Sequence, residues 1–462
     1  MALTKIITDG ITDDAVTEDK LANAINTAVA ANTAKDLTAL SASNLTSGTI
    51  PDARFPATLP AASAANLTAV PAANITGTLP AISAANLTNV PAANITGTLP
   101  AISGANLTNL PASGQARNLI INGAMQVAQY GSSFSNISTS GVYGSVDRMM
   151  MVGANLDQLQ FAAKQTSDGP DGFANCFEFD VTTAESALDA NDLAYIRYKI
   201  EGQDLVPLYN ANGTGKNFVI SFYVKSNQAG TYQLNIYKDQ GPRFISKTYT
   251  ISSANTWEYK TYTFSTTGFT TGSFHTGNLV GLRLVFSLGN GPGRQADPAS
   301  GWSTQTRMGP TGETNLVATN GATLDISSVQ LEEGTQATKF EHRSYGEELS
   351  RCQRYFVSYG NTGSLHFGMG TAYNATALNI TVPLPVPMRG EPTVAKISSG
   401  GNWLQAYVGA SGTTSDPTPQ LGESGMSVYR VYVPSAGSGW TAGDSFWCQI
   451  IPNARLTFSA EL

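Results

Sequence analysis

The sequence has little charge and little histidine. Only 13% of its 462 residues are Asp, Glu, Lys or Arg, and the formal net charge is −7. Binding to nucleic acid requires a positive surface, so we expect no nucleic-acid partner. The three histidines, His275, His342 and His366, stand alone without a metal-ligand spacing. We therefore expect no metal site, and no motif indicates a cofactor.

Cysteine and long apolar runs are also scarce. Cys176, Cys352 and Cys448 are odd in number and far apart, which predicts reduced, buried thiols rather than a disulfide framework. No stretch approaches the roughly eighteen apolar residues of a membrane-spanning helix. The start, MALTKIITDG, has no signal-peptide core. We expect a protein that is made in the cytoplasm and is not secreted through a membrane.

Small residues take the place of charge. The chain has 45 glycines and 22 prolines among abundant Asn, Ser and Thr. This composition favours strands and turns over long helices. The length is too great for one ordinary core and indicates two or three domains.

The N-terminal region divides into a polar arm and a short helix. Residues 1–16 are interpreted as an attachment arm. A helix is expected after Thr17, whose hydroxyl can cap the first free amides. Its residues Leu21, Ile25, Ala28 and Asn32 have the spacing of a coiled-coil seam, which predicts a short coiled coil over 17–40. A single amphipathic helix packed on another element remains the alternative.

A twenty-residue repeat follows. NLTAVPAANITGTLPAISAA (66–85) is followed by NLTNVPAANITGTLPAISGA (86–105), and no charged residue occurs from Phe55 to Ala116. Each unit has only about five large apolar side chains, too few for one chain to offset the entropy of ordering about twenty residues. Repetition around a threefold axis would bury them. We therefore predict a fibrous shaft over 41–116 that forms an intertwined trimer, with a disordered linker as the alternative.

The remaining chain alternates like β-strands. Phe218, Ile220, Phe222 and Val224 alternate with Val219, Ser221, Tyr223 and Lys225, and Asn-Gly turn signals recur. A capping box, SYGE at 344–347, predicts a short helix through about Tyr355. We predict a mainly β protein with two jelly-roll-like β-sandwich domains, at 117–343 and 344–462.

The β region contains the segments RNLIINGAMQVAQYG (117–131), VDRMM (146–150), ISSVQLEEGTQATKFEHRSYGEELSRCQRYF (326–356), VPMRGEPTV (386–394) and FSAEL (458–462). These segments resemble parts of bacteriophage tail-fibre proteins, including those of marine and cyanobacterial phages. The resemblance covers residues 117–462. It implies a homotrimeric receptor-binding fibre of the virion. Its N-terminus would join tail or adaptor proteins, and its C-terminal β domains would bind a bacterial surface glycan or protein.

Sugar recognition requires exposed rings that stack on the apolar faces of sugars, with hydrogen-bonding groups nearby. Three tryptophans in Gly-, Ser- or Asn-rich surroundings and one nearby tyrosine are the candidate receptor-binding residues: Trp302, Trp403, Tyr407 and Trp440. Weak contacts would suffice in a trimer, because multivalency raises the overall affinity.

Two other functions remain alternatives. The chain could be a structural tail or baseplate adaptor without host contact. It could also be a polysaccharide depolymerase, which needs two carboxylates across a cleft. The adjacent pairs Glu332-Glu333 and Glu347-Glu348 are better explained by solvated or capping roles, so we expect no enzyme. The acidic loop Asp189–Asp192 could hold calcium but is more simply a polar turn.

Overall fold

The computed structural model describes residues 23–33, 118–137, 141–209, 215–241, 243–265, 277–298, 301–304, 308–360, 362–398, 401–408, 411–424 and 428–462. The predicted arm (1–16) and shaft (41–116) lie outside the described residues. Residues 1–102 and 103–462 form two separate units.

The first unit contributes one described helix, α1, at Asn23–Thr33. This confirms a helix within the predicted 17–40 segment. Ile25 and Val29 are 50% and 59% exposed in the single chain. The coiled coil and the trimer stay predictions. Within the described part of the chain, no helix has the length and apolar character needed to cross a membrane.

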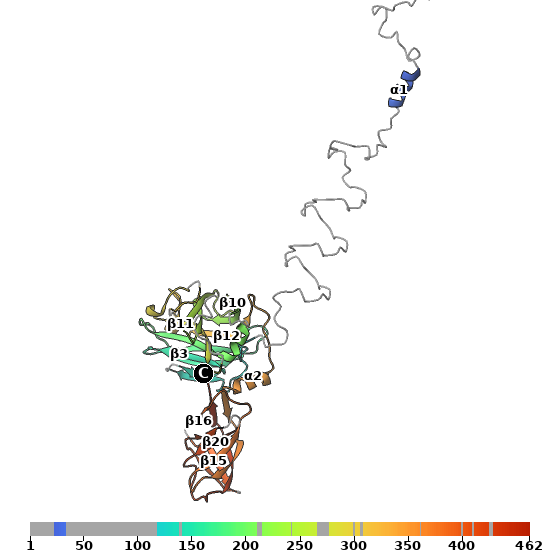
Figure 1. Cartoon of the computed structure of the whole chain (residues 1–462). Coiled ribbons are helices and arrows are strands. Elements are labelled where there is room, and N and C mark those ends of the chain that lie inside the picture. Colours follow the sequence, from blue (N-terminus) through green and yellow to red (C-terminus); the bar gives the residue numbers. More distant parts are fainter. Residues whose placement is uncertain are drawn as a thin grey trace, which may run out of the picture. The chain divides into compact units, whose positions relative to one another are not determined.

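The second unit begins with a β-sandwich of two six-stranded antiparallel sheets, which we call the sandwich domain (Figure 1). The first sheet has the order β1 (Ser133–Ile137), β4 (Gln160–Thr166), β5 (Cys176–Thr183), β12 (Thr323–Glu333), β7 (Phe218–Ser226) and β10 (Glu258–Phe264). The second has the order β2 (Val142–Tyr143), β3 (Met149–Ala154), β6 (Leu193–Glu201), β11 (Val280–Asn290), β8 (Gly230–Lys238) and β9 (Arg243–Ile251). Three short 3-10 turns lie between strands, at Gly202–Leu208, Pro292–Arg294 and Leu316–Ala318.

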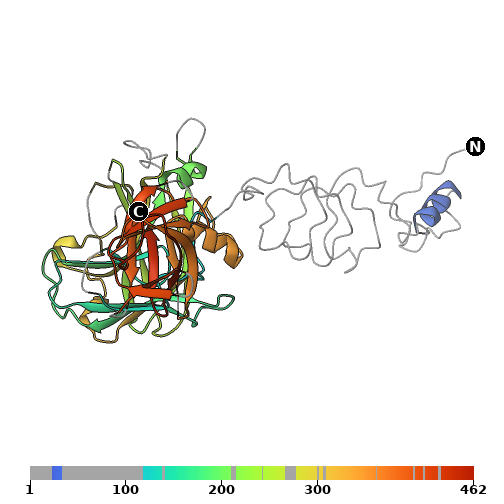
Figure 2. The same cartoon turned by 90° about the horizontal axis from the view of Figure 1, so that it is seen from below.

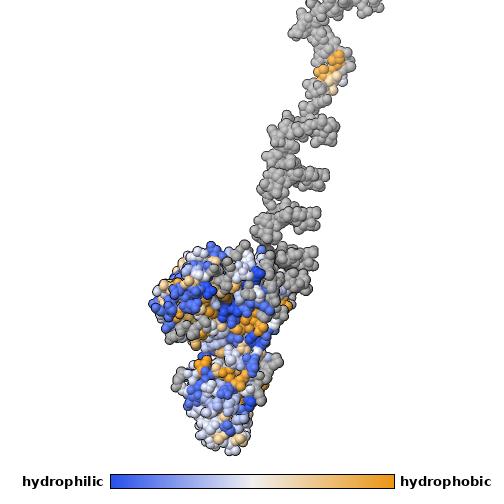
Figure 3. Space-filling model, turned by 60° about the vertical axis from the view of Figure 1, so that its left-hand side comes forward, coloured by the Kyte–Doolittle hydropathy of each residue, from blue (hydrophilic) through white to orange (hydrophobic). Residues whose placement is uncertain are grey.

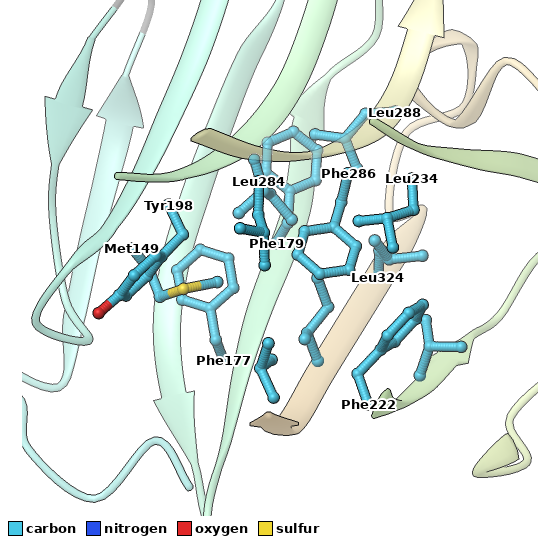
Figure 4. Close-up of a cluster of buried hydrophobic side chains, with 14 of the residues drawn as sticks. Met149, Phe177, Phe179, Tyr198, Phe222, Leu234, Leu284, Phe286, Leu288 and Leu324 are labelled. Carbon is cyan, nitrogen blue, oxygen red and sulfur yellow. The ribbon is translucent and has the colours of Figure 1, made fainter. Parts of the chain in front are cut away.

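The core of the sandwich domain lies between these sheets, where alternate residues of each strand meet. Figure 4 shows side chains of both sheets gathered in this cluster, among them Phe179 of β5 and Leu284 of β11. Phe222 of β7 packs edge-on against Phe286 of β11, with ring centroids 5.1 Å apart. In β7, Phe218, Ile220, Phe222 and Val224 are fully buried as predicted, but Val219 and Ser221 on the other face are buried as well.

A second β-sandwich follows, which we call the C-terminal β domain; its strands are orange and red in Figure 2. The smaller sheet has the order β13 (Phe356–Tyr359), β22 (Arg455–Ser459) and β16 (Thr393–Ile397). The larger has the order β18 (Ser411–Ser415), β17 (Leu404–Val408), β21 (Ser445–Ile450), β14 (Leu365–Ala372), β15 (Leu378–Pro383), β20 (Val428–Val433) and β19 (Gln420–Ser424). Residues of both sheets form one buried cluster.

The helix α2 (Tyr345–Gln353) connects the two domains. The predicted N-cap is present, because the backbone N–H of Glu347 donates to the Ser344 hydroxyl over 3.3 Å, while the Glu347 carboxylate pairs with Arg351. The helix ends at Gln353 rather than about Tyr355, whose backbone N–H instead closes a turn on Cys352.

The first described residues of the sandwich domain, 118–123, are hydrogen-bonded to a bulge in β12. The register of β12 shifts between Ser327 and Gln330. At the bulge, the Val329 N–H donates to the Gly123 carbonyl over 2.9 Å, and the Asn118 side-chain amide donates to the Val329 carbonyl over 3.0 Å. A side chain at Gly123 would meet the Val329 oxygen at 2.2 Å, so this close approach requires glycine.

Buried charges join the motifs that are far apart in sequence. Arg343 donates to the carboxylate of Glu348 over 2.8 Å and to the backbone carbonyls of Asn118 and Ile120. Arg148, 1% exposed, pairs with Glu461 next to the C-terminus. The end of the chain, marked C in Figure 1, lies against the sandwich domain, where Lys199 donates to the Leu462 carbonyl. We call this set the polar junction: Asn118, Arg148, Arg343, Glu348 and Glu461.

Candidate functional site

Trp403, one of the four candidate rings, is not on the surface. It is fully buried just before β17, and its indole N–H donates to the Pro417 carbonyl over 2.6 Å. The expectation that it contacts a receptor was wrong. Glycine- and asparagine-rich neighbours indicate a turn, but they do not decide which side of the turn a large ring takes.

Trp302 and Trp440 are half-buried and lie in different domains. Trp302 packs on the core of the sandwich domain and donates its indole N–H to the Ser265 carbonyl over 2.9 Å. Trp440, between β20 and β21, packs edge-on against Phe446 with ring centroids 4.7 Å apart. Both rings have a packing role, and neither stacks with another of the four candidates.

Tyr407, the fourth candidate, lies on the outer face of the seven-stranded sheet. Its ring stacks on Trp447 of β21, with centroids 4.1 Å apart and planes 9° apart. Trp447 is 41% exposed. Trp447 was not among the candidate residues, although the alternation of its strand indicates which way it faces. Phe446, Cys448 and Ile450 alternate toward the core, so the residue between the first two faces outward.

Neighbouring strands extend this pair into an exposed strip. On β14, Met369 is the cross-strand partner of Trp447 and is 70% exposed. His366, also on β14, has its ring 4.8 Å from the Trp447 ring. We call His366, Met369, Tyr407 and Trp447 the ring platform. Its members come from three adjacent strands of a continuous sheet, which holds them at fixed spacing.

A glycine on β18 leaves room for the outer ring of the platform. Gly412 is the cross-strand partner of Tyr407. A Cβ atom at this position would lie 2.5 Å from a carbon of the Tyr407 ring. The ring therefore lies over the glycine backbone, flat against Trp447.

Hydrogen-bonding side chains surround the rings. Gln405 of β17 lies two residues before Tyr407 and is half-buried, and its cross-strand partner Gln449 of β21 is buried, with 9% exposed. On the other side, Thr381 of β15 is the cross-strand partner of both Met369 and Arg430. Amides, a hydroxyl and a guanidinium thus flank the platform, and they can donate to and accept from hydroxyl-rich ligands.

The platform lacks carboxylates. Of the seven strands in this sheet, only β19 contains an Asp or Glu, namely Glu423. Beneath the platform, burial raises the pKa of the Cys448 thiol to about 12. That thiol stays protonated at neutral pH and faces the core. The platform is therefore built for contact with apolar faces and hydroxyl groups, not with cationic ligands.

The acidic pairs considered for catalysis have structural partners. Glu332 is buried at the end of β12 and accepts from the backbone N–H and the hydroxyl of Thr338. Glu348 belongs to the polar junction, and Glu347 pairs with Arg351 along the helix. In the loop considered for calcium, Asp192 accepts from the Asp189 N–H over 2.7 Å, as in a polar turn. Among the described residues, no group of three His, Cys, Asp or Glu could hold a metal ion.

The three cysteines are free and buried, as predicted. Burial raises the pKa of Cys176 to about 12, and it raises the pKa of Cys352 as well. None of these thiols is placed for nucleophilic or redox chemistry, because the thiolate is the reactive form.

No family model matches the sequence, and no curated protein matches it. Among solved structures, the chain is similar to a putative sugar binding protein from Bacteroides thetaiotaomicron, with 12% identity, 47% of this chain and 100% of that chain covered, and a TM-score of 0.26. It is also similar to the family 11 carbohydrate-binding module from Clostridium thermocellum in complex with a β-1,3-1,4-mixed-linked tetrasaccharide, with 13% identity, coverages of 44% and 98%, and a TM-score of 0.25. A third is TmCBM61 in complex with β-1,4-galactotriose, with 11% identity, coverages of 47% and 100%, and a TM-score of 0.22.

Proposed function

We propose that this chain is a bacteriophage receptor-binding fibre whose ring platform binds a neutral glycan on the host surface. The single observation that carries the glycan claim is the stacked pair of half-buried Tyr407 and exposed Trp447 on the outer face of a sheet, with the Gln405 amide and the Thr381 hydroxyl on neighbouring positions. Such a surface fits the apolar face of a sugar ring while its neighbours bond the hydroxyls.

Hydropathy alone would not find this surface. Tyr407 and Trp447 are residues of near-neutral hydropathy, although Met369 beside them is apolar and His366 is polar. The face of the C-terminal β domain that Figure 3 shows is mostly pale. A surface of near-neutral hydropathy that carries aromatic rings is compatible with water, and its rings can still stack on a sugar. Removal of such rings from water on contact with a sugar would provide the main favourable free energy.

The fibre role is supported by the tail-fibre resemblance of residues 117–462. In this proposal the N-terminal segment joins the tail, three chains share the repeat segment, and adhesion is non-covalent. Three platforms per fibre would multiply weak single-site affinities through effective concentration. No catalytic step is part of the proposal.

Adsorption competition tests the function as a whole. Purified full chain should block adsorption of the phage that encodes it, and a host mutant that lacks the surface glycan should not bind the protein. Binding to tail proteins without binding to host cells would favour the adaptor. Release of reducing sugar ends from host polysaccharide would establish a depolymerase instead.

A further inference from the structure

A second group of rings lies on the outer face of the first sheet of the sandwich domain. Tyr259 of β10 and Tyr223 of β7 have centroids 5.0 Å apart, and Phe173 lies 6.2 Å from Tyr223. Phe173 also contacts Phe340 and His342, each with its centroid 5.0 Å away. We call Phe173, Tyr223, Tyr259, Phe340 and His342 the ring patch. Tyr259 is 46% exposed, and His342 is exposed too.

The composition of the ring patch differs from that of the ring platform. The side chains of Phe173 and Phe340 have no polar atom, whereas each ring of the platform (Tyr, Trp and His) has a hydrogen-bonding group. A half-buried phenylalanine gains most by complete removal from water, which a protein surface provides better than a hydrated glycan. Charged residues border the patch: Lys225, on the same face of β7, pairs with Asp168, which is 73% exposed. An apolar centre with a charged rim is typical of a protein–protein contact.

The patch also lies where the chain enters the domain. The backbone N–H of Asn118 donates to the Glu341 carboxylate over 2.6 Å, and Phe340 and His342 flank Glu341 in sequence. Residues 34–117 precede this anchor, including the repeat that predicts association of several chains. If chains leave a shared segment at Asn118, their sandwich domains begin next to one another. The surfaces beside Asn118 are then the first to meet.

We propose that the ring patch is the surface on which the sandwich domain of a second copy of this chain packs. The inference rests on the association of chains in the proposed function. The contact needs little affinity of its own, because the shared segment keeps the copies at high effective concentration. Its role is to fix the sandwich domains against one another, so that the ring platforms keep a constant spacing.

Thiol labelling of the full chain tests this inference, since the three native thiols are buried. Thr261→Cys places a reporter on β10, two residues from Tyr259 on the same exposed side. Thr250→Cys is the matched control, because Thr250 is an exposed threonine on β9 of the other sheet. In native protein, alkylation at position 261 should be about tenfold slower than at position 250, since a packed interface excludes water and reagent. Addition of Tyr259→Asp should restore rapid alkylation at 261.

Several outcomes would overturn the proposal. They are equal alkylation rates at the two positions, or a full chain that is monomeric by mass. If the thiol at position 261 is protected in a monomeric chain, the patch is covered by the segment that precedes it in the same chain. Protection that appears only when host glycan is added would make it a second glycan site. Glycan binding is measured separately. If the chain binds no glycan but the thiol at position 261 is still protected, the result counts against the proposed function alone.

Discussion

The polar junction contains buried charged side chains, whereas the ring platform consists of exposed or half-buried side chains, mostly rings, without carboxylates. The junction buries two arginines and two glutamates, and Arg343 and Glu348 expose only 3% and 7% of their side chains. The platform exposes rings and carries no carboxylate on its three strands. Buried charges are tolerated only with complete pairing, which fixes one geometry. Exposed rings cost little stability, so their presence on a polar surface points to contact with another molecule.

The difference separates positions that hold the fold from positions available for recognition. The junction connects segments that are more than 200 residues apart, such as Asn118 and Arg343. The platform uses residues whose loss leaves the core of the C-terminal β domain intact. Changes in the junction should therefore alter stability most, whereas changes in the platform should alter binding most.

The largest effect is expected from loss of the buried arginine. Arg343→Ala leaves the Glu348 carboxylate buried without its cation, and the free energy of unfolding should fall by about 3–5 kcal/mol. Arg351→Ala is the matched control, because its i,i+4 pair with Glu347 is 36% and 48% exposed. That change should cost less than about 0.5 kcal/mol. Urea unfolding followed by tryptophan fluorescence measures both, and equal losses would show that the junction has no special weight.

A smaller loss is expected from a methyl group at the bulge of β12. Gly123→Ala would place Cβ 2.2 Å from the Val329 carbonyl oxygen, so the backbone must shift. We expect a loss of about 1–3 kcal/mol, typical of overpacking. Gly346→Ala in α2 is the control, because no atom lies within 4 Å of its Cβ position. It should be neutral or slightly stabilising. Thermal unfolding distinguishes the two, and an unchanged midpoint for Gly123→Ala would contradict the close approach.

Asp147, the chain neighbour of Arg148 in the polar junction, should make stability depend on pH. Burial raises the pKa of Asp147 from its ordinary value to about 7, against the opposing effect of hydrogen bonds from Gln129. The folded state therefore binds this proton more tightly than the unfolded state. Stability should be greatest below the unfolded pKa and should decline as pH rises from about 4 to 7.

Asp147→Asn should flatten this dependence, whatever its effect on absolute stability. Urea unfolding at pH 5 and pH 7 gives the comparison. Asp325 has its pKa raised to about 6, also mainly by burial, and would leave a residual slope of the same sign. If the free energy of unfolding of Asp147→Asn changes between pH 5 and pH 7 as much as that of the natural chain, Asp147 does not cause the pH dependence.

The mildest change alters the platform without removing a ring. Gly412→Ala would bring Cβ within 2.5 Å of the Tyr407 ring, which must then tilt away from Trp447. Glycan affinity should fall severalfold, with stability within about 0.5 kcal/mol of the natural chain, as is usual for a surface substitution. Calorimetric titration with the bound glycan measures the affinity. Unchanged affinity would mean that the stacked geometry is unimportant.

The sequence predicts strands better than it predicts faces. The strand β7 and the N-cap at Ser344 are indicated by local signals, and both are present in the structure. Trp403 and Trp447 illustrate this difference: Trp403, in a Gly- and Asn-rich turn, is fully buried, whereas Trp447, between Phe446 and Cys448 in a strand, faces outward. The side that a ring takes depends on the sheet that packs behind it, which is a long-range property.

The polar junction could not be predicted from the sequence either, because its contacts are also long-range. Arg148 and Glu461 are 313 residues apart, and neither has a local pattern that identifies its partner. Both lie in segments that resemble tail-fibre proteins, but this resemblance does not indicate that the two segments meet in one buried cluster.

The most direct test of the account is the glycan affinity of two single variants of the full chain. On an array of bacterial surface polysaccharides, Trp447→Ala should bind at least about tenfold more weakly than the natural chain, as expected when a central ring is lost from a binding surface. Tyr345→Ala removes a ring that is 57% exposed at the start of α2 and should bind normally. Both variants should unfold like the natural chain. Full binding by a correctly folded Trp447→Ala protein would contradict the central claim.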